Sequence, residues 1–187
     1  MHGDSADEAR QLGAEVERLR RRVAELERLA DADTLTPLLN RRAFMRALDR
    51  AVAAADRHAT PAVLMFADID RLKRVNDSWG HASGDAVLLH VAAVLLREVR
   101  TTDTVARIGG DEFGLLLTHL DAEAAAAKAQ SLARAVGEGT PRLPDGMPIP
   151  VRISIGWTAI RSGDTAGQLL SHADGHMYEA RAQRSDR

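Results

Sequence analysis

The fold is decided by one stretch, Arg107-Ile108-Gly109-Gly110-Asp111-Glu112-Phe113. Apolar residues stand on both sides of it, with Val105 before it and the run 115–117 after it. Two successive glycines between such runs predict a tight β-hairpin, because a positive φ costs glycine nothing. The missing side chains also leave room for a bulky anionic ligand. Asp111 and Glu112 begin the return strand, where neighbouring side chains face opposite ways, so they are not both surface residues of one face.

A second acidic group follows the apolar run 63–67. Five apolar residues without alternation predict a strand that is buried on both faces. Asp68 and Asp70 share one face of this strand, and one of them can lie beside the hairpin acids if the strands are neighbours. Carboxylates gathered at strand ends suit a hard divalent cation such as Mg²⁺. Solvated strand ends are the alternative for either group alone, whereas the two groups together favour a metal site.

The composition narrows the class of protein. The chain has 25 basic and 27 acidic residues, so no basic surface is implied and a nucleic acid polymer is not an expected partner. It has no cysteine, which excludes disulfides and thiol chemistry. No apolar stretch is long enough to span a membrane, and there is no signal-peptide pattern. We therefore expect a cytoplasmic protein.

The N-terminal part carries a heptad pattern. Residues 1–9 are predicted to be a disordered start and residues 10–32 a coiled-coil stalk. Leucine and valine or alanine alternate at heptad positions d and a: Leu12, Val16, Leu19, Val23, Leu26 and Ala30. This choice of residues is typical of parallel dimers, so we expect a homodimer through the coiled coil. An amphipathic helix that packs on its own domain is the alternative.

The remaining residues, 33–187, are predicted to form one α+β domain. After a polar turn at 33–40, helices are predicted at 41–57, 83–99, 121–136 and 165–181, with a short helical or loop piece at 73–79. Strands are predicted at 62–69, 104–108, 111–118 and 151–160. Ser83 is the expected N-cap of its helix. This order predicts an antiparallel sheet flanked by helices.

The stretch 107–113 resembles the signature of the GGDEF family, the diguanylate cyclases. The resemblance runs from about Asp33 to about Arg181 and covers most of the chain. Beyond the signature it includes Asp33-Thr34-Leu35-Thr36-Pro37-Leu38-Leu39-Asn40-Arg41-Arg42-Ala43-Phe44, the Asp68 strand, Asn76-Asp77-Ser78-Trp79-Gly80-His81 and Gly84-Asp85. It implies that 33–187 is a GGDEF catalytic domain with the ferredoxin-like palm of nucleotide cyclases. It also implies a homodimer that condenses two GTP into cyclic di-GMP and two pyrophosphates.

The resemblance implies a site for two Mg²⁺ ions, with Mn²⁺ as a substitute. Asp68, Asp111 and Glu112 would be metal ligands, together with the carbonyl of Ile69. Two metal ions would lower the pKa of the attacking ribose hydroxyl and neutralise charge on the leaving group. Asp111 and Glu112 would also be catalytic, and Lys73 would stabilise phosphate charge. A solvated lysine is the alternative for Lys73.

Four further residues would bind substrate. Asn76 and Asp85 fall where the family reads guanine, although Asp85 also suits the first turn of a helix as a dipole partner. His81 lies nearby and is either a substrate contact or a structural histidine. Arg181 stands where the family often has lysine, and Ser185 stands where it has a later phosphate-binding arginine. Arg181 keeps the charge of a lysine but not its geometry.

Arg100-Thr101-Thr102-Asp103 resembles the RxxD inhibitory site of the family, in which cyclic di-GMP binds as product and inhibitor. Arginine can bind guanine or phosphate in a bidentate way, and aspartate can accept from guanine N1 and N2. An ordinary surface ion pair is the alternative. Two rival functions stay open: a purine cyclase that forms a cyclic mononucleotide, and a non-catalytic module that binds GTP or cyclic di-GMP.

Overall fold

The computed structural model describes residues 3–142 and 146–185, and the side chains of 1–11, 28, 174 and 178–187 lie outside that description. The chain divides into two compact units, Met1–Ala32 and Asp33–Arg187. In the described part of the chain, every helix is too short or too polar to cross a membrane.

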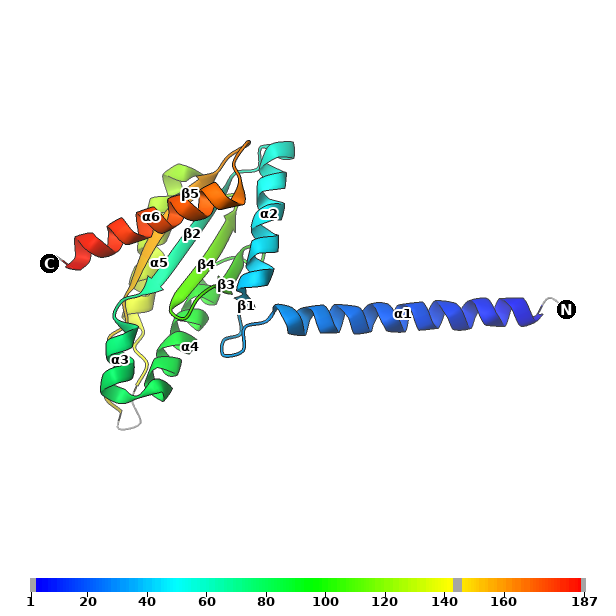
Figure 1. The fold of residues 1–187 in the computed structure, drawn as a ribbon, viewed down its shortest axis with the longest axis horizontal. Coiled ribbons are helices and arrows are strands. Elements are labelled where there is room, and N and C mark those ends of the chain that lie inside the picture. The colour runs from blue at the N-terminus through cyan, green and yellow to red at the C-terminus, as the bar shows by residue number, and fades with distance from the viewer. Residues whose placement is uncertain (1–2, 143–145, 186–187) are drawn as a thin grey trace. The chain divides into compact units, whose positions relative to one another are not determined.

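The first unit is the helix α1 (Gly3–Asp31) (Figure 1). Because α1 begins at Gly3, the predicted disordered start is wrong for residues 3–9. Acidic residues at 4, 7 and 8 favour a helix N-terminus through the helix dipole, which the prediction did not weigh. The heptad residues Leu12, Val16, Leu19, Val23 and Leu26 are between 44% and 61% exposed. Among the described side chains of this unit, none covers this apolar face.

The second unit is built on a five-stranded sheet (Figure 1). Its strands follow the spatial order β1-β3-β4-β2-β5. In chain order they are β1 (Leu39–Asn40), β2 (Ala62–Ile69), β3 (Thr104–Arg107), β4 (Glu112–Thr118) and β5 (Ile153–Ile160). The four longer strands are antiparallel to their neighbours, as predicted, whereas β1 pairs parallel to β3 and makes the sheet mixed. The sequence analysis missed β1, because a two-residue strand leaves no periodic pattern.

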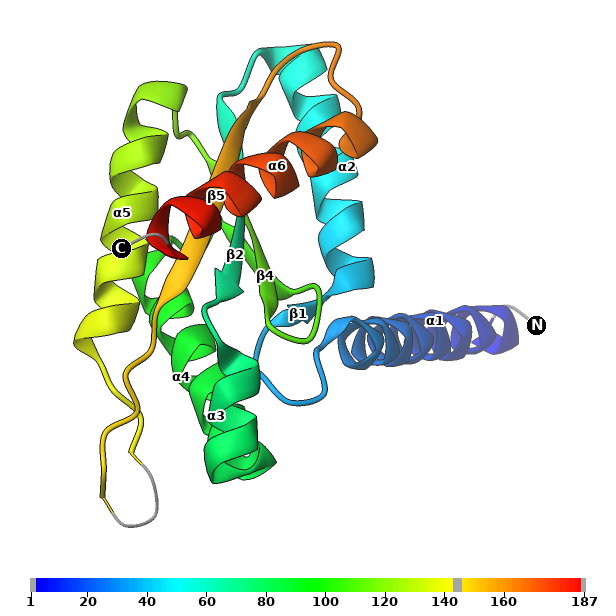
Figure 2. The same cartoon turned by 60° about the vertical axis from the view of Figure 1, so that its left-hand side comes forward.

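Helices cover both faces of this sheet (Figures 1 and 2). They are α2 (Arg41–His58), α3 (Leu72–Trp79), α4 (His81–Glu98), α5 (Ala122–Glu138) and α6 (Ala166–Ser185). Every residue of β2 is buried, which confirms the prediction of a strand covered on both sides. Alternate β2 residues belong to different cores: Met65 packs with residues of α4 and α5, and Phe66 packs with residues of α2 and α6.

The predicted N-cap of α4 is wrong. The helix begins at His81, directly after Gly80, whose φ is 80°. Glycine reaches this left-handed backbone without strain, and the chain passes from α3 to α4 through this one residue. Ser83 therefore lies inside the first turn, where its hydroxyl donates to the carbonyl of Trp79 at 2.9 Å.

Candidate active site

The signature stretch forms the turn between β3 and β4. The amide of Ile108 donates to the carbonyl of Glu112 at 2.9 Å, and Nη2 of Arg107 donates to the carbonyl of Gly110 at 2.7 Å. Neither Gly109 nor Gly110 has a positive φ, so the predicted backbone reason for the two glycines is wrong. At position 109 a glycine fits because a Cβ atom there would collide with the side chain of Glu112. At Gly110 a Cβ atom would meet nothing within 4 Å, so the tip is open.

The structure brings the two acidic groups to one end of the sheet. Asp68 on β2 lies directly opposite Glu112 on β4, and Asp68 is only 4% exposed. The amide of Ile69 donates to the carbonyl of Asp111 at 3.1 Å, so the strand contact continues past the end of β4. The expectation that the two strands are neighbours is therefore confirmed.

The hairpin acids belong to different cavities. Glu112 lines a cavity of about 310 Å³ on the α2 and α6 side of the sheet, whereas Asp111 lines one of about 490 Å³ on the α3 and α4 side. Within the described residues, no three His, Asp or Glu side chains gather closely enough to hold a metal ion. The donors present at this end are nevertheless carboxylate and carbonyl oxygens. They fit Mg²⁺, which usually takes one or two protein carboxylates plus water and substrate phosphates.

The larger cavity collects most of the predicted substrate residues. It brings Lys73, Asn76, His81 and Asp85 together with Asp111. Its lining is completed by Leu72, Asp77, Gly84, Leu88, Arg107 and Gly110. Asp68 and Glu112 do not line this cavity, and the side chain of Arg181 on α6 lies outside the described residues.

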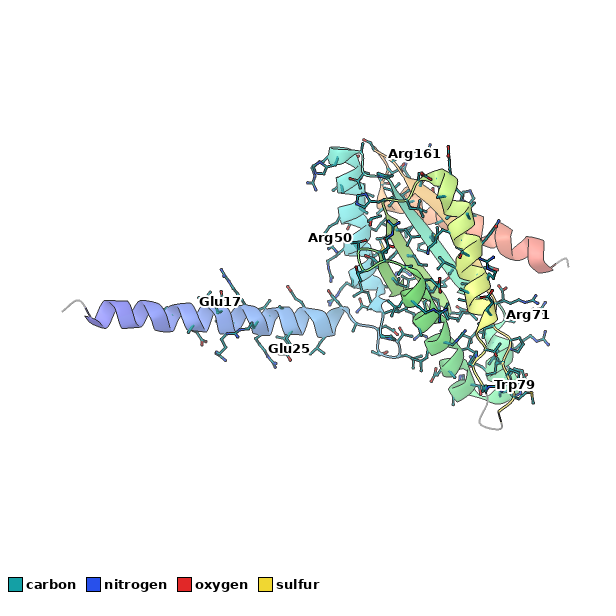
Figure 3. The ribbon with its side chains drawn as sticks, turned by 180° about the vertical axis from the view of Figure 1, so that it is seen from behind. Glu17, Glu25, Arg50, Arg71, Trp79 and Arg161 are labelled. Carbon is teal, nitrogen blue, oxygen red and sulfur yellow. The ribbon has the colours of Figure 1, made fainter. Side chains whose placement is uncertain are left out.

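The packing of α3 against α4 positions the pair expected to read guanine. A Cβ atom at Gly84 would overlap the side-chain oxygen of Asn76, so a glycine is required for Asn76 to lie against α4 beside Asp85. Arg71, at the start of α3, has a left-handed backbone with φ 61°. Arg71 and Trp79 mark the two ends of this helix in Figure 3. The role of Gly84 was not predicted, because it depends on how two helices cross.

Arg107 is a site residue that the sequence analysis did not identify. Its side chain is 16% exposed and its Nη1 lies 3.5 Å from Oδ1 of Asp33. That oxygen also accepts from the hydroxyl of Thr36 at 2.7 Å and from the amides of Leu35 and Thr36. Burial alone would raise the pKa of Asp33, but these hydrogen bonds and the charge of Arg107 outweigh it and hold the pKa below its ordinary value. Arg107 thus joins the start of the domain to the signature turn.

The predicted inhibitory residues lie apart from this cavity. Arg100 is exposed, and its amide donates to Oδ2 of Asp103 at 3.0 Å. Oδ1 of Asp103 accepts from the amide of Thr118 at 3.0 Å, so Asp103 ties this turn to the end of β4. Neither Arg100 nor Asp103 lines either of the two cavities.

Comparison with known proteins identifies the family of this chain. The family described as "Diguanylate cyclase, GGDEF domain" matches residues 30–187. This chain belongs to the GGDEF family. It is 38% identical to the diguanylate cyclase TpbB of Pseudomonas aeruginosa over 167 residues, which are 89% of this chain and 38% of TpbB. It is 36% identical to the probable diguanylate cyclase DgcT of Escherichia coli over 82% of this chain and 34% of DgcT. The chain thus spans little more than a third of these relatives.

Solved structures confirm the predicted fold. The coiled coil and GGDEF domain of DgcB from Caulobacter crescentus, in complex with c-di-GMP, superposes with a TM-score of 0.85 at 30% identity. That match covers 95% of this chain and 94% of the DgcB chain. The GGDEF domain of TpbB superposes with a TM-score of 0.75 at 38% identity, over 81% of this chain and 88% of that domain.

Proposed function

We propose that this chain is the catalytic part of a diguanylate cyclase, which condenses two GTP into cyclic di-GMP and two pyrophosphates. One observation carries the proposal: Asp111 of the signature shares a cavity with Lys73, Asn76, His81 and Asp85, which come from α3 and α4. The names of TpbB and DgcT point to the same activity.

The cavity chemistry suits guanine. An amide at Asn76 and a carboxylate at Asp85 together complement the O6 acceptor and the N1 and N2 donors of guanine, a pattern that adenine does not present. His81, which lines the same cavity, would contact the bound nucleotide. Arg181 on α6 would neutralise the triphosphate.

The acids at the strand ends would hold the metal. Asp68, Asp111 and Glu112, with the carbonyl of Ile69, are the ligands we assign to Mg²⁺ or Mn²⁺. When bound, two such ions lower the pKa of the ribose 3′-hydroxyl and neutralise charge on the leaving pyrophosphate. Asp111 helps to remove the proton of that hydroxyl. Lys73 supplies positive charge to the phosphate under attack.

Two protomers must meet, because each holds one GTP and the product joins both. We assign their association to the exposed heptad face of α1. Leu19→Asp with Leu26→Asp should halve the mass measured by light scattering and lower the rate per protomer in dilute protein. The control is Arg18→Asp with Glu25→Asp, which places aspartates on the outward heptad positions. An unchanged mass for the leucine variant would show that α1 does not pair the protomers.

We also assign product feedback to Arg100 and Asp103. Because they lie outside the cavity of Asp111, a ligand there acts through coupling between two sites, typically about 5–150-fold in affinity. Arg100→Ala should still make cyclic di-GMP but should no longer slow when cyclic di-GMP is added. Arg97→Ala, a nearby exposed arginine, is the control. Equal inhibition of wild type and Arg100→Ala would place the inhibitory site elsewhere.

Arg181 and Ser185, which depart from the family pattern, favour a second candidate: a sensor that binds GTP or cyclic di-GMP without turnover. Incubation of the protein with GTP and Mg²⁺, with products identified by mass, separates the candidates. The proposal expects cyclic di-GMP and pyrophosphate. Binding without product would support the sensor, and a cyclic mononucleotide would support a purine cyclase.

A further inference from the structure

A fully buried polar residue lies beside the metal-binding acids without an assigned role. Ser154 on β5 is 0% exposed and lies directly opposite Asp68 on β2. A buried hydroxyl is costly unless it forms a hydrogen bond. The hydroxyl of Ser154 donates to Oδ1 of Asp70 at 2.7 Å, across 84 residues of sequence. Because the acceptor is a carboxylate, this is among the stronger kinds of hydrogen bond.

Asp70 stands where β2 turns into α3. Its amide donates to the carbonyl of Arg152 at 2.9 Å, while the amide of Ile69 donates to the carbonyl of Asp111 at 3.1 Å. The two residues are thus held from opposite sides, by the chain leading into β5 and by the signature turn. The next residue, Arg71, has a left-handed backbone with φ 61° and ψ 30°. A non-glycine residue keeps such a backbone only when the surrounding structure holds it.

The turn after Asp70 carries the groups on which the proposed reaction depends. Ile69 offers a carbonyl to the metal, and Lys73, in the first turn of α3, lines the nucleotide cavity. A small rotation at residues 70 and 71 would displace both groups, and catalysis is sensitive to misplacement of about 1 Å. The hydrogen bond from Ser154 restrains that rotation from a fully buried position on β5.

We propose that Ser154 is a positioning residue for nucleotidyl transfer, which acts by holding Asp70 and thereby the turn that carries Ile69 and Lys73. The inference rests on the proposed cyclase function. It gives Asp70, the second acid of the Asp-Ile-Asp sequence, the task of anchoring the turn. The reaction would depend on β5 although the residues that line the cavity of Asp111 include none from β5.

The test compares Ser154→Ala, Ser154→Thr and Asp70→Ala in the full chain. Ser154→Ala should lower kcat about tenfold, the size expected for losing one hydrogen bond to a charged group, with the KM for GTP changed less than about twofold. Ser154→Thr retains the hydroxyl and should restore the rate. The double variant Ser154→Ala/Asp70→Ala should be no slower than Asp70→Ala, because both changes remove the same restraint.

A second readout does not need turnover. Amide hydrogen exchange in the segment 67–75 should be about tenfold faster in Ser154→Ala than in wild type, because the turn opens more often. Ser83→Ala, which removes another buried serine hydroxyl, is the matched control and should leave that segment unchanged. If the wild-type protein makes no cyclic di-GMP, the proposed function is overturned. Amide exchange would still test whether Ser154 restrains the turn after Asp70, because that measurement does not need activity. The positioning role would be overturned if amide exchange in segment 67–75 of Ser154→Ala had the wild-type rate. It would also be overturned if the loss of kcat in the double variant were the product of the losses in the two single variants.

Discussion

The two cavities beside the signature turn differ in kind although adjacent residues line them. On the α3 and α4 side, Asp111 shares its cavity with lysine, asparagine, histidine and aspartate side chains. On the α2 and α6 side, Glu112 faces a cavity in which most of the other lining residues are of apolar type, although Arg41 and Ser171 are among them. These other residues are Arg41, Phe44, Met45, Phe66, Ile108, Leu170, Ser171 and Met177. The alternation of side chains along a strand produces this division. One short stretch thus places two adjacent carboxylates toward two different cavities.

The largest effect on activity should come from a substitution on the α3 and α4 side of the sheet. Asp111→Asn should lower cyclic di-GMP formation by about 100-fold or more, the order seen when one preorganised charged group is removed from an active site. The thermal midpoint should stay near that of wild type, since the side chain lines an open cavity. Asp49→Asn, an exposed aspartate on α2, controls for the charge change. Normal product formation by Asp111→Asn would refute the assignment of chemistry to this face.

A smaller change on the same side should alter selectivity. Asp85→Asn should weaken the binding of GTP by about tenfold or more, the cost of losing a hydrogen bond to a charged group. ITP lacks the 2-amino group of guanine, so wild type should prefer GTP over ITP and the variant should not. The measurement is kcat/KM for both nucleotides. A preference retained by Asp85→Asn would mean that guanine is read elsewhere.

A substitution on the α2 and α6 side of the sheet should instead affect the stability of the fold. A Cβ atom at Gly114 on β4 would come within 2.6 Å of the ring of Phe44 on α2. Gly114→Ala should therefore lower the free energy of unfolding by about 1–3 kcal/mol, the usual cost of overpacking a core. Urea denaturation measures this, and the rate per folded molecule should remain that of wild type. The double variant with Phe44→Leu, which shortens the opposing side chain, should recover part of the loss.

The smallest effect concerns the link between the domain start and the signature turn. The pKa of Asp33 is lower in the folded protein than in the unfolded chain, so its stabilising effect is present above about pH 4 and is lost as pH falls through the folded-state pKa. Asp33→Asn should therefore be less stable than wild type at pH 7, and the gap should close on acidification. Urea denaturation midpoints of both proteins, from pH 7 to pH 3, measure this difference in stability. A gap that persists at pH 3 would show that the charge of Asp33 is not responsible.

Local patterns predicted the parts of the fold that depend on local physics. The apolar run before Asp68 gave β2, and the two runs around Gly109 gave β3 and β4, with the acids at neighbouring strand ends. Lys73 and the substrate residues Asn76, His81 and Asp85 were named from the family resemblance, and the structure gathers all four in one cavity.

The features that the sequence did not show depend on tertiary contacts. Gly84 makes room for Asn76 across two helices, so no local pattern marks its role. Arg107 and Asp33 are 74 residues apart, and β1 exists because β3 offers it a partner. The misplaced cap at Ser83 has the same origin, since Gly80 joins two helices that a sequence reading treats separately.

The place of β2 in the sheet has a consequence for how the chain is made on the ribosome. Its eight residues pair with β4 on one edge and with β5 on the other, and β5 is the last strand to be synthesised. Until residue 160 has emerged, the nascent chain presents an unpaired edge of the sequence Ala-Val-Leu-Met-Phe-Ala, which has the apolar, uncharged character of aggregation-prone segments. Chains arrested before β5 should therefore depend on chaperones, and the end of the sheet that carries Asp68 and Asp111 should be completed late in synthesis.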